Sequence, residues 1–154
     1  MPAHRKPDTE LKHKSSVWLT PELISIIQAT FPEGRGNMSG RINTILSRYA
    51  EMVARSAPEL SLSEWGAVCD ANNGTMTDDM PASVTLLWAN VHDSRGLDEK
   101  WDVDVKKLVN KMRAWSYAES VACAEIVERF WSDPIPEDNR EWLIKCGARI
   151  PEGK

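Results

Sequence analysis

A chain of 154 residues, with 42% apolar and 27% charged residues, is long enough for one globular domain or for a small domain followed by a medium one. No apolar run approaches the roughly 18 residues of a membrane helix, and the first residues lack the apolar core of a signal peptide. We therefore expect a cytoplasmic protein with no membrane partner. The spacing of Cys69, Cys123 and Cys146 indicates neither a disulfide framework nor a metal site, so reduced, buried thiols are expected.

The net charge of −4 is divided unequally along the chain. Residues 1–56 hold eight Lys/Arg and five Asp/Glu, a net charge of +3, whereas residues 57–154 hold eleven and eighteen, a net charge of −7. A basic region suits a polyanion, and an acidic region is repelled by one. Any nucleic-acid surface is therefore expected in the first part, although ordinary scatter also accounts for so small a positive charge.

The first elements are an arm and a strand. Residues 1–11 are polar and contain two prolines, which predicts a flexible basic arm. Residues 12–20 alternate with a period of two, which predicts a short β-strand. A disordered tail before a helical hairpin is the alternative. The two faces of the predicted strand hold Lys14, Ser16 and Trp18 on one side, and Val17 and Leu19 on the other.

Two helices are expected to follow. At Thr20 the sequence Thr-Pro-Glu supplies a hydroxyl N-cap, a proline at the first helical position and an acid in the first turn. This helix is expected to end at Pro32, and a second begins near Ser39, with a serine cap and apolar residues at steps of three and four. One strand and two helices can hardly bury a core alone. The strand is therefore expected to pair with that of a second copy.

The remaining chain predicts an acidic all-α domain over residues 57–154. Two serine and glutamate pairs, Ser61 with Glu64 and Ser116 with Glu119, have the spacing of capping boxes. No strand is predicted in this region. The expected helices span roughly residues 62–73, 80–94, 103–115, 117–132 and 137–147.

Two segments, SVWLTPELISII and NMSGRINTILSRY, resemble the ribbon-helix-helix family of bacterial and phage repressors, of the Arc and MetJ type. The resemblance covers residues 13–55 only. It implies an intertwined homodimer whose two strands form an antiparallel ribbon in the major groove of double-stranded DNA. The fold class is then mainly α, with a ribbon-helix-helix domain at residues 12–56 before the all-α domain.

The resemblance also implies roles for individual residues. Trp18, at the central reading position, would either contact thymine methyl groups or pack against a partner. Arg35 and Arg41 would flank a phosphate site, or lie on the surface as solvated charges. The side chains that contact bases would be Lys14, Ser16, Trp18 and Thr20. The groups that contact phosphate would be Arg35, Met38, Ser39, Gly40 and Arg41. The dimer core would hold Val17, Leu19, Leu23, Ile27, Ile42, Ile45, Leu46 and Tyr49.

The all-α domain offers little chemistry. Six of the seven tryptophans lie in it, and packing in the core is favoured over a ligand cage. No Walker loop, G-x-S-x-G sequence or Gly-rich dinucleotide turn occurs. We expect no enzymatic activity, no metal and no cofactor. The acid-base or metal candidates that lack further ligands nearby are His92 with Asp93, and the acidic cluster Asp98, Glu99, Asp102 and Asp104.

The sequence thus favours a sequence-specific DNA-binding protein, a transcriptional repressor that acts as a dimer on palindromic or repeated half-sites. A tetramer is left open, as is a protein partner bound through residues 57–154. The alternative is an interaction protein, either an antitoxin or an accessory factor of plasmid partition or conjugation. An antitoxin is expected to carry a short disordered tail, whereas the region after residue 56 is predicted to be folded. A helical protein without DNA contact is the third hypothesis.

Overall fold

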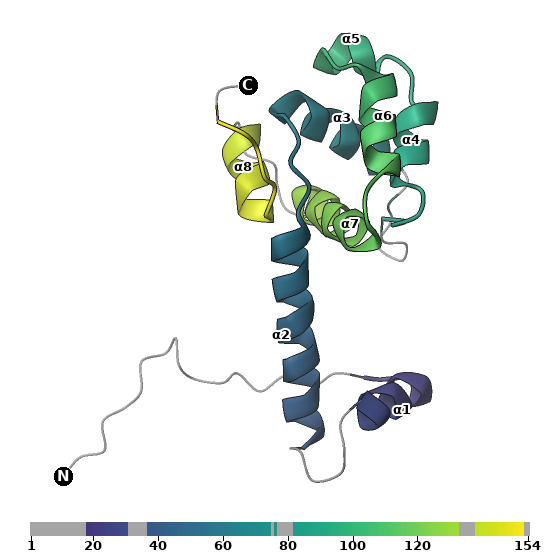
Figure 1. Cartoon of the computed structure of the whole chain (residues 1–154), viewed down its shortest axis with the longest axis vertical. Coiled ribbons are helices and arrows are strands. Elements are labelled where there is room, and N and C mark those ends of the chain that lie inside the picture. The colour runs from purple at the N-terminus through teal and green to yellow at the C-terminus, as the bar shows by residue number, and fades with distance from the viewer. Residues whose placement is uncertain (1–17, 31–36, 75, 77–81, 133–137, 153–154) are drawn as a thin grey trace, which may run out of the picture. The chain divides into compact units, whose positions relative to one another are not determined.

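The computed structural model describes residues 18–30, 37–74, 76, 82–132 and 138–152. Within these residues the chain forms eight helices (Figure 1), and an isolated parallel bridge between Glu59 and Arg149 is the β-pairing present there. The mainly helical fold class is confirmed. The chain divides into two compact units, which we call the head, ending at Ile45, and the body, beginning at Leu46. The division lies inside a helix rather than after residue 56.

The head begins with α1 (Pro21–Thr30). This helix starts where the sequence predicts, because the Thr20 hydroxyl accepts a hydrogen bond from the Leu23 amide at 3.4 Å. The arm and residues 12–17 of the expected strand lie outside the described residues. The last three strand residues, Trp18 to Thr20, belong to no helix or strand.

The second helix, α2 (Met38–Ser56), begins slightly earlier than expected. Asn37 Oδ1 accepts a hydrogen bond from the Gly40 amide at 2.9 Å. The expected serine cap is therefore wrong, because Asn37 supplies the capping oxygen and Ser39 lies inside the first turn.

The boundary between head and body lies within α2 because the last turns of this helix contact the body. Val53 is buried in a small cluster with Val121 and Ala122 of the body. The Arg149 guanidinium donates to the carbonyl of Arg55 at 3.1 Å and to that of Ala54 at 3.5 Å. These carbonyls belong to the last turn of the helix, which has no further amides of its own to satisfy them. The C-terminal half of α2 is consequently part of the body.

Six further helices complete the body (Figure 1). The first, α3, contacts α4, α5 and α7, while α4 packs on α6, and α7 on α8. Trp65 of α3, Leu108 of α6 and Val127 of α7 are all fully buried in one hydrophobic core. The bounds of the six are α3 (Leu62–Asn73), α4 (Leu87–Asp93), α5 (Leu97–Trp101), α6 (Val105–Arg113), α7 (Tyr117–Ser132) and α8 (Asn139–Cys146).

Both predicted capping boxes are present. Ser61 Oγ accepts from the Glu64 amide at 3.1 Å, and the Glu64 carboxylate accepts from the Ser61 amide at 2.8 Å. Ser116 and Glu119 make the same reciprocal pair ahead of α7. The helices that follow these boxes, α3 and α7, have the predicted bounds.

The body differs from the prediction between α3 and α6. The helix expected at residues 80–94 is confined to α4, and the five-residue α5 was not expected. Left-handed residues isolate α5 at both ends, because Gly96 has φ 74° and Asp102 has φ 50°. Neither conformation continues a right-handed helix, so the chain turns twice within a few residues.

The tryptophans of the body mostly pack, as expected. Trp65 is fully buried, and its indole N–H donates to the Arg149 carbonyl at 3.1 Å. The other five are partly buried against the same core, namely Trp88, Trp101, Trp115, Trp131 and Trp142. All three cysteines are buried and form no disulfide, and burial raises the pKa of the Cys69 and Cys123 thiols.

Candidate functional site

The expected base-reading face is described only at its end. Lys14 and Ser16 lie outside the described residues. Trp18 is 99% exposed, so it packs against none of the residues that the structure describes. Thr20 is also exposed, and its hydroxyl caps α1.

The two helix starts of the head differ in charge. Glu22 lies in the first turn of α1, where its own backbone amide and the Thr20 hydroxyl lower the pKa of its carboxyl group. A charged carboxylate at this end repels phosphate. The first turn of α2 contains no acidic residue. The start of α2 is therefore the better anion site of the two.

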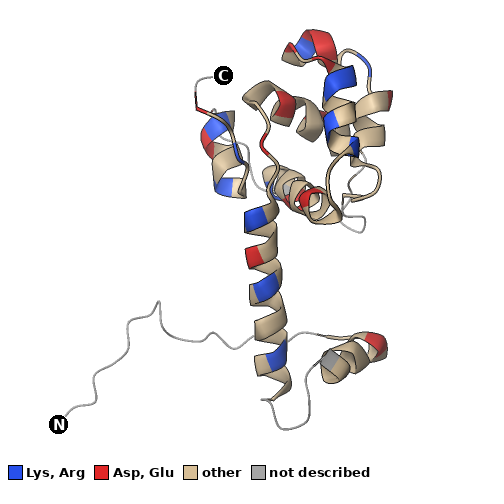
Figure 2. Ribbon diagram, in the orientation of Figure 1, with Lys and Arg blue, Asp and Glu red and all other residues tan. Residues whose placement is uncertain are grey.

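The structure brings together four of the five residues expected at the phosphate site. Met38, Ser39 and Gly40 form the first turn of α2, followed directly by the half-buried Arg41. Arg35 lies outside the described residues. Since the Gly40 amide already donates to Asn37, a phosphate would be bound mainly by the amides of Met38 and Ser39. Figure 2 shows basic residues spaced along α2.

The residues expected in the dimer core are not all buried in the single chain. Ile27 is the one buried side chain among the described residues of the head. Leu23 is 46% exposed and its neighbour Ile26 is 59% exposed, so α1 presents apolar surface to solvent. The remaining described members are half-buried or exposed, namely Leu19, Ile42, Ile45, Leu46 and Tyr49. Val17 lies outside the described residues.

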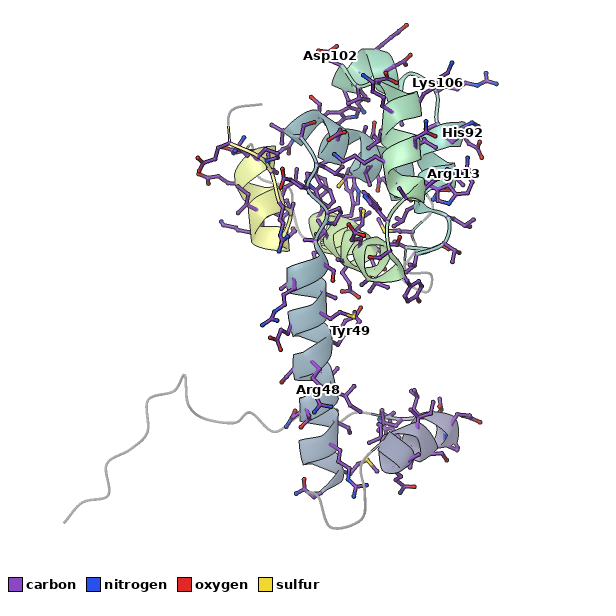
Figure 3. The ribbon with its side chains drawn as sticks, viewed as in Figure 1. Arg48, Tyr49, His92, Asp102, Lys106 and Arg113 are labelled. Carbon is purple, nitrogen blue, oxygen red and sulfur yellow. The ribbon has the colours of Figure 1, made fainter. Side chains whose placement is uncertain are left out.

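Tyr49 has a partner within its own chain. Its hydroxyl donates to Glu125 Oε1 of α7, and this hydrogen bond, with some desolvation, raises the pKa of Tyr49 to about 12. Figure 3 labels Tyr49 next to Arg48 on α2. The hydroxyl of Tyr49 is thus tied to α7 within the body, which leaves only the ring for the expected dimer contact.

A pocket of about 320 Å³ lies within the body. The Trp101 ring rests directly on Gly66, where a Cβ would lie 2.3 Å from the ring. The Trp131 indole N–H donates to the Cys69 carbonyl at 3.0 Å, which fixes the second indole. We call this the aromatic pocket, lined by Leu62, Gly66, Cys69, Asp70, Lys100, Trp101, Phe130, Trp131, Asn139 and Leu143.

The acidic group of the aromatic pocket is the Asp70 carboxylate, and Lys100 and Asn139 are also polar residues of its lining. Its Oδ2 accepts from Lys100 Nζ at 2.7 Å and from the Trp101 indole at 3.2 Å. Burial raises the pKa of Asp70, but these hydrogen bonds and the Lys100 charge together lower it below its ordinary value. Asp70 is therefore ionised at neutral pH, with its charge held at the wall of an otherwise mainly apolar pocket.

The acid-base candidates from the sequence are not gathered into a site. His92 Nδ1 lies 2.9 Å from Asp93 Oδ1, and both side chains are exposed on α4, where Figure 3 labels His92. Asp104 caps α6 through the Lys107 amide at 3.0 Å. In the part of the chain that the structure describes, no group of three or more His, Cys, Asp or Glu side chains is placed to hold a metal ion.

Comparisons with protein-family models, with curated proteins and with solved structures gave no match. No helix within the described ranges is both long and apolar enough to cross a membrane.

Sequence reasoning missed two features of these sites. The Asn37 cap was overlooked in favour of Ser39, although asparagine is an equally good N-cap and both residues stand in the same turn. The aromatic pocket was also missed. The tryptophan content was the available signal, but the pairing of Asp70 with Lys100 joins two helices and leaves no local pattern.

Proposed function

We propose that this chain is a DNA-binding homodimer that acts as a transcriptional repressor. In this proposal the strand before α1 pairs with its counterpart in a second copy, and the paired ribbon enters the major groove. The starts of the two α2 helices bind phosphates on either side. The proposal includes no catalytic step and no cofactor.

The observation that carries the proposal is the apolar surface of α1. Leu23 and Ile26 stand on a helix of ten residues and are 46% and 59% exposed. A second copy that covers them would add to the core of the described part of the head. Because both side chains are already about half buried, covering the rest would contribute roughly half of the 1.5–3 kcal/mol that full burial of such a side chain gives.

Electrostatics support the same arrangement. The head, residues 1–45, holds six Lys/Arg and four Asp/Glu, a net charge of +2, against −6 for the body. The start of α2 has no acid in its first turn and is followed by Arg41. Amides and the helix dipole attract a phosphate there without reading sequence. Sequence preference is left to the segment that includes Trp18 and Thr20.

The proposal is tested by selection of duplex DNA of random sequence with the full chain, at several salt concentrations. We expect retention at low salt, a steep loss of binding as salt rises, and enrichment of a two-fold symmetric motif. Light scattering should give the mass of a dimer. No retention at the lowest salt, with the dimer intact, would overturn the DNA-binding role.

A pair of variants separates phosphate contact from general charge. Arg41→Ala should weaken binding to all sequences alike and make the logarithmic salt dependence shallower by about one unit for each phosphate that is no longer neutralised. Arg95→Ala removes the same charge from an exposed position in the body and should leave that slope unchanged. A sequence-specific loss in Arg41→Ala would contradict the phosphate assignment.

A second candidate is an interaction protein, such as an antitoxin or a partition or conjugation accessory factor. The observation that favours it is a groove of about 360 Å³ in the body, with Trp88, Trp115 and Tyr117 in its lining. The Arg113 guanidinium stacks over Trp88 at 4.8 Å, and aromatic and arginine side chains are enriched at protein interfaces. Failure to retain DNA would leave this groove as the main candidate for partner binding.

A further inference from the structure

The aromatic pocket has walls that are fixed before any ligand arrives. The Trp101 ring is held against Gly66, and its N–H donates to Asp70 at 3.2 Å. The Trp131 N–H is used by the Cys69 carbonyl, and the Trp131 ring meets Phe130 edge-on, with ring centroids 5.0 Å apart. Because both indole N–H groups are occupied, the rings offer mainly their faces and apolar edges to the pocket.

The size of the pocket limits what it can bind. Pockets for small molecules span roughly 300–1,000 Å³, and 320 Å³ lies at the lower end of that range. A molecule of one or two rings fits this volume. The apolar part of the lining, which includes Leu62 and Leu143, suits such rings better than it suits a sugar or a phosphate.

The charged residues in the lining of the aromatic pocket, Asp70 and Lys100, determine which ligand charge the pocket favours. The Lys100 ammonium is 2.7 Å from Asp70 Oδ2 and 5.6 Å from the centre of the Trp101 ring. A cation is therefore already stabilised here between a carboxylate and an aromatic face. The Lys100 side chain is 59% exposed and the Asp70 side chain is 27% exposed, so the lysine can move into water at little cost.

We propose that the aromatic pocket binds a small aromatic amine, with its ring among Trp101, Phe130 and Trp131 and its ammonium on Asp70 in place of that of Lys100. This function is independent of DNA binding, because every residue involved lies in the body. The ligand cation gains the same two stabilising contacts as the lysine, and in addition its ring is removed from water.

The test uses the indole N–H signals of the full, ¹⁵N-labelled chain in a heteronuclear NMR spectrum, assigned by single Trp→Phe variants. Phenethylamine is the probe, and 3-phenylpropionate is its anionic counterpart with the same ring. We expect phenethylamine to shift the Trp101 and Trp131 signals saturably, while the signals of Trp18 and Trp65 stay in place. Equal or stronger binding of 3-phenylpropionate, or no saturable shift of Trp101 and Trp131, would overturn the proposal.

Three variants test the assigned charges. Asp70→Asn should weaken phenethylamine binding about tenfold, because it removes the charge of the acceptor. Asp93→Asn removes an equivalent charge from an exposed position on α4 and should change nothing. Lys100→Met removes the internal competitor and should strengthen binding several-fold. Weaker binding in Lys100→Met would show that the lysine itself contacts the ligand, and would overturn the replacement.

Unfolding of the variants is excluded by thermal denaturation and by the Trp65 signal, which reports on the core rather than on the pocket. Gly66→Ala tests by steric displacement whether the ligand contacts the Trp101 ring. A Cβ at this position would lie 2.3 Å from the Trp101 ring and must displace it. Phenethylamine binding should then fall in a folded chain, and unchanged binding would show that the ligand does not contact the Trp101 ring.

Discussion

The body and the head bury their apolar side chains to very different extents. The body encloses one large core, in which Trp65, Leu87 and Leu143 are almost fully buried. In the described part of the head only Ile27 is buried, while Leu23 and Ile26 remain largely exposed. The body therefore has a core of its own, whereas the described part of the head leaves apolar side chains of α1 exposed, which is the basis of the proposed dimer.

The largest expected effect tests this contrast with two tryptophans. Trp65→Ala removes a fully buried side chain and its hydrogen bond to Arg149, and should lower the free energy of unfolding of the body by about 3–5 kcal/mol. Trp18→Ala changes a 99% exposed residue and should alter stability by no more than about 0.5 kcal/mol. Urea denaturation followed by circular dichroism measures both.

If Trp18→Ala proves as costly as Trp65→Ala, Trp18 is buried in the assembled protein and belongs to the dimer core. Retention of the dimer with reduced sequence preference would instead place Trp18 on the DNA.

The second expected effect concerns assembly. Leu23→Lys places a charge on the exposed apolar face of α1 and should reduce dimer affinity more than about 100-fold, because the dimer would bury that charge. DNA binding should be lost with the dimer, and thermal unfolding of the body should not change. Gln28→Lys adds the same charge at an exposed polar position of α1 and serves as the matched control.

Light scattering and DNA binding of Leu23→Lys and Gln28→Lys test whether the chain dimerises through α1. A monomeric wild-type chain, or a Leu23→Lys chain that dimerises as well as Gln28→Lys, would remove the basis for a partner at α1.

A smaller effect on stability distinguishes Ser61, which caps α3, from Ser39, which lies beside the Asn37 cap of α2. Ser61→Ala breaks the capping box of α3 and should cost about 1 kcal/mol of unfolding free energy. Ser39→Ala should cost much less, since Asn37 caps α2, but it should weaken DNA binding if Ser39 contacts phosphate. Denaturation measures the stability of both variants, and salt-dependent DNA titration measures the binding of Ser39→Ala. A stability loss in Ser39→Ala equal to that in Ser61→Ala would show that Ser39, and not Asn37, caps α2.

The smallest effect is a pH dependence of the contact between α2 and α7 within the body. The pKa of Tyr49 is raised to about 12 by its hydrogen bond to Glu125. Because the folded pKa exceeds the ordinary value of about 10, the stabilisation is complete below about pH 10 and is lost as the pH rises towards 12. Alkaline titration of tyrosinate absorbance should show this late component, and Tyr49→Phe should remove it.

Glu125→Ala should move the same component to lower pH without abolishing it. A tyrosinate titration that is unaffected by Glu125→Ala would show that the Tyr49 hydroxyl is not bound to Glu125 of α7.

Local signals explain what the sequence could predict. Thr20 and Pro21 mark the start of α1, and Ser61 with Glu64 marks that of α3, because a cap is a contact between residues a turn apart. The short α5 was missed because Asp102 adopts a left-handed conformation that its residue type does not require. No sequence window of a few residues contains that information.

The sites were predicted less completely, for a related reason. The aromatic pocket depends on Asp70 meeting Lys100 across two helices, and the place of Tyr49 depends on Glu125 of α7. Such pairs are set by packing after the helices form. The ribbon and the phosphate site stay predictions, since the decisive partners are a second chain and DNA.

Arg149 connects the two ends of the helical part that follows α2. Its backbone forms the parallel β-bridge with Glu59. Its carbonyl accepts hydrogen bonds from the Leu60 amide at 3.2 Å and from the Trp65 indole at 3.1 Å. Its guanidinium donates to the Arg55 carbonyl at the end of α2. The entry and exit of the helical part that follows α2 are therefore held side by side. A module closed in this way has the geometry that suits transplantation onto another helix or circular permutation, with new ends opened in an exposed loop.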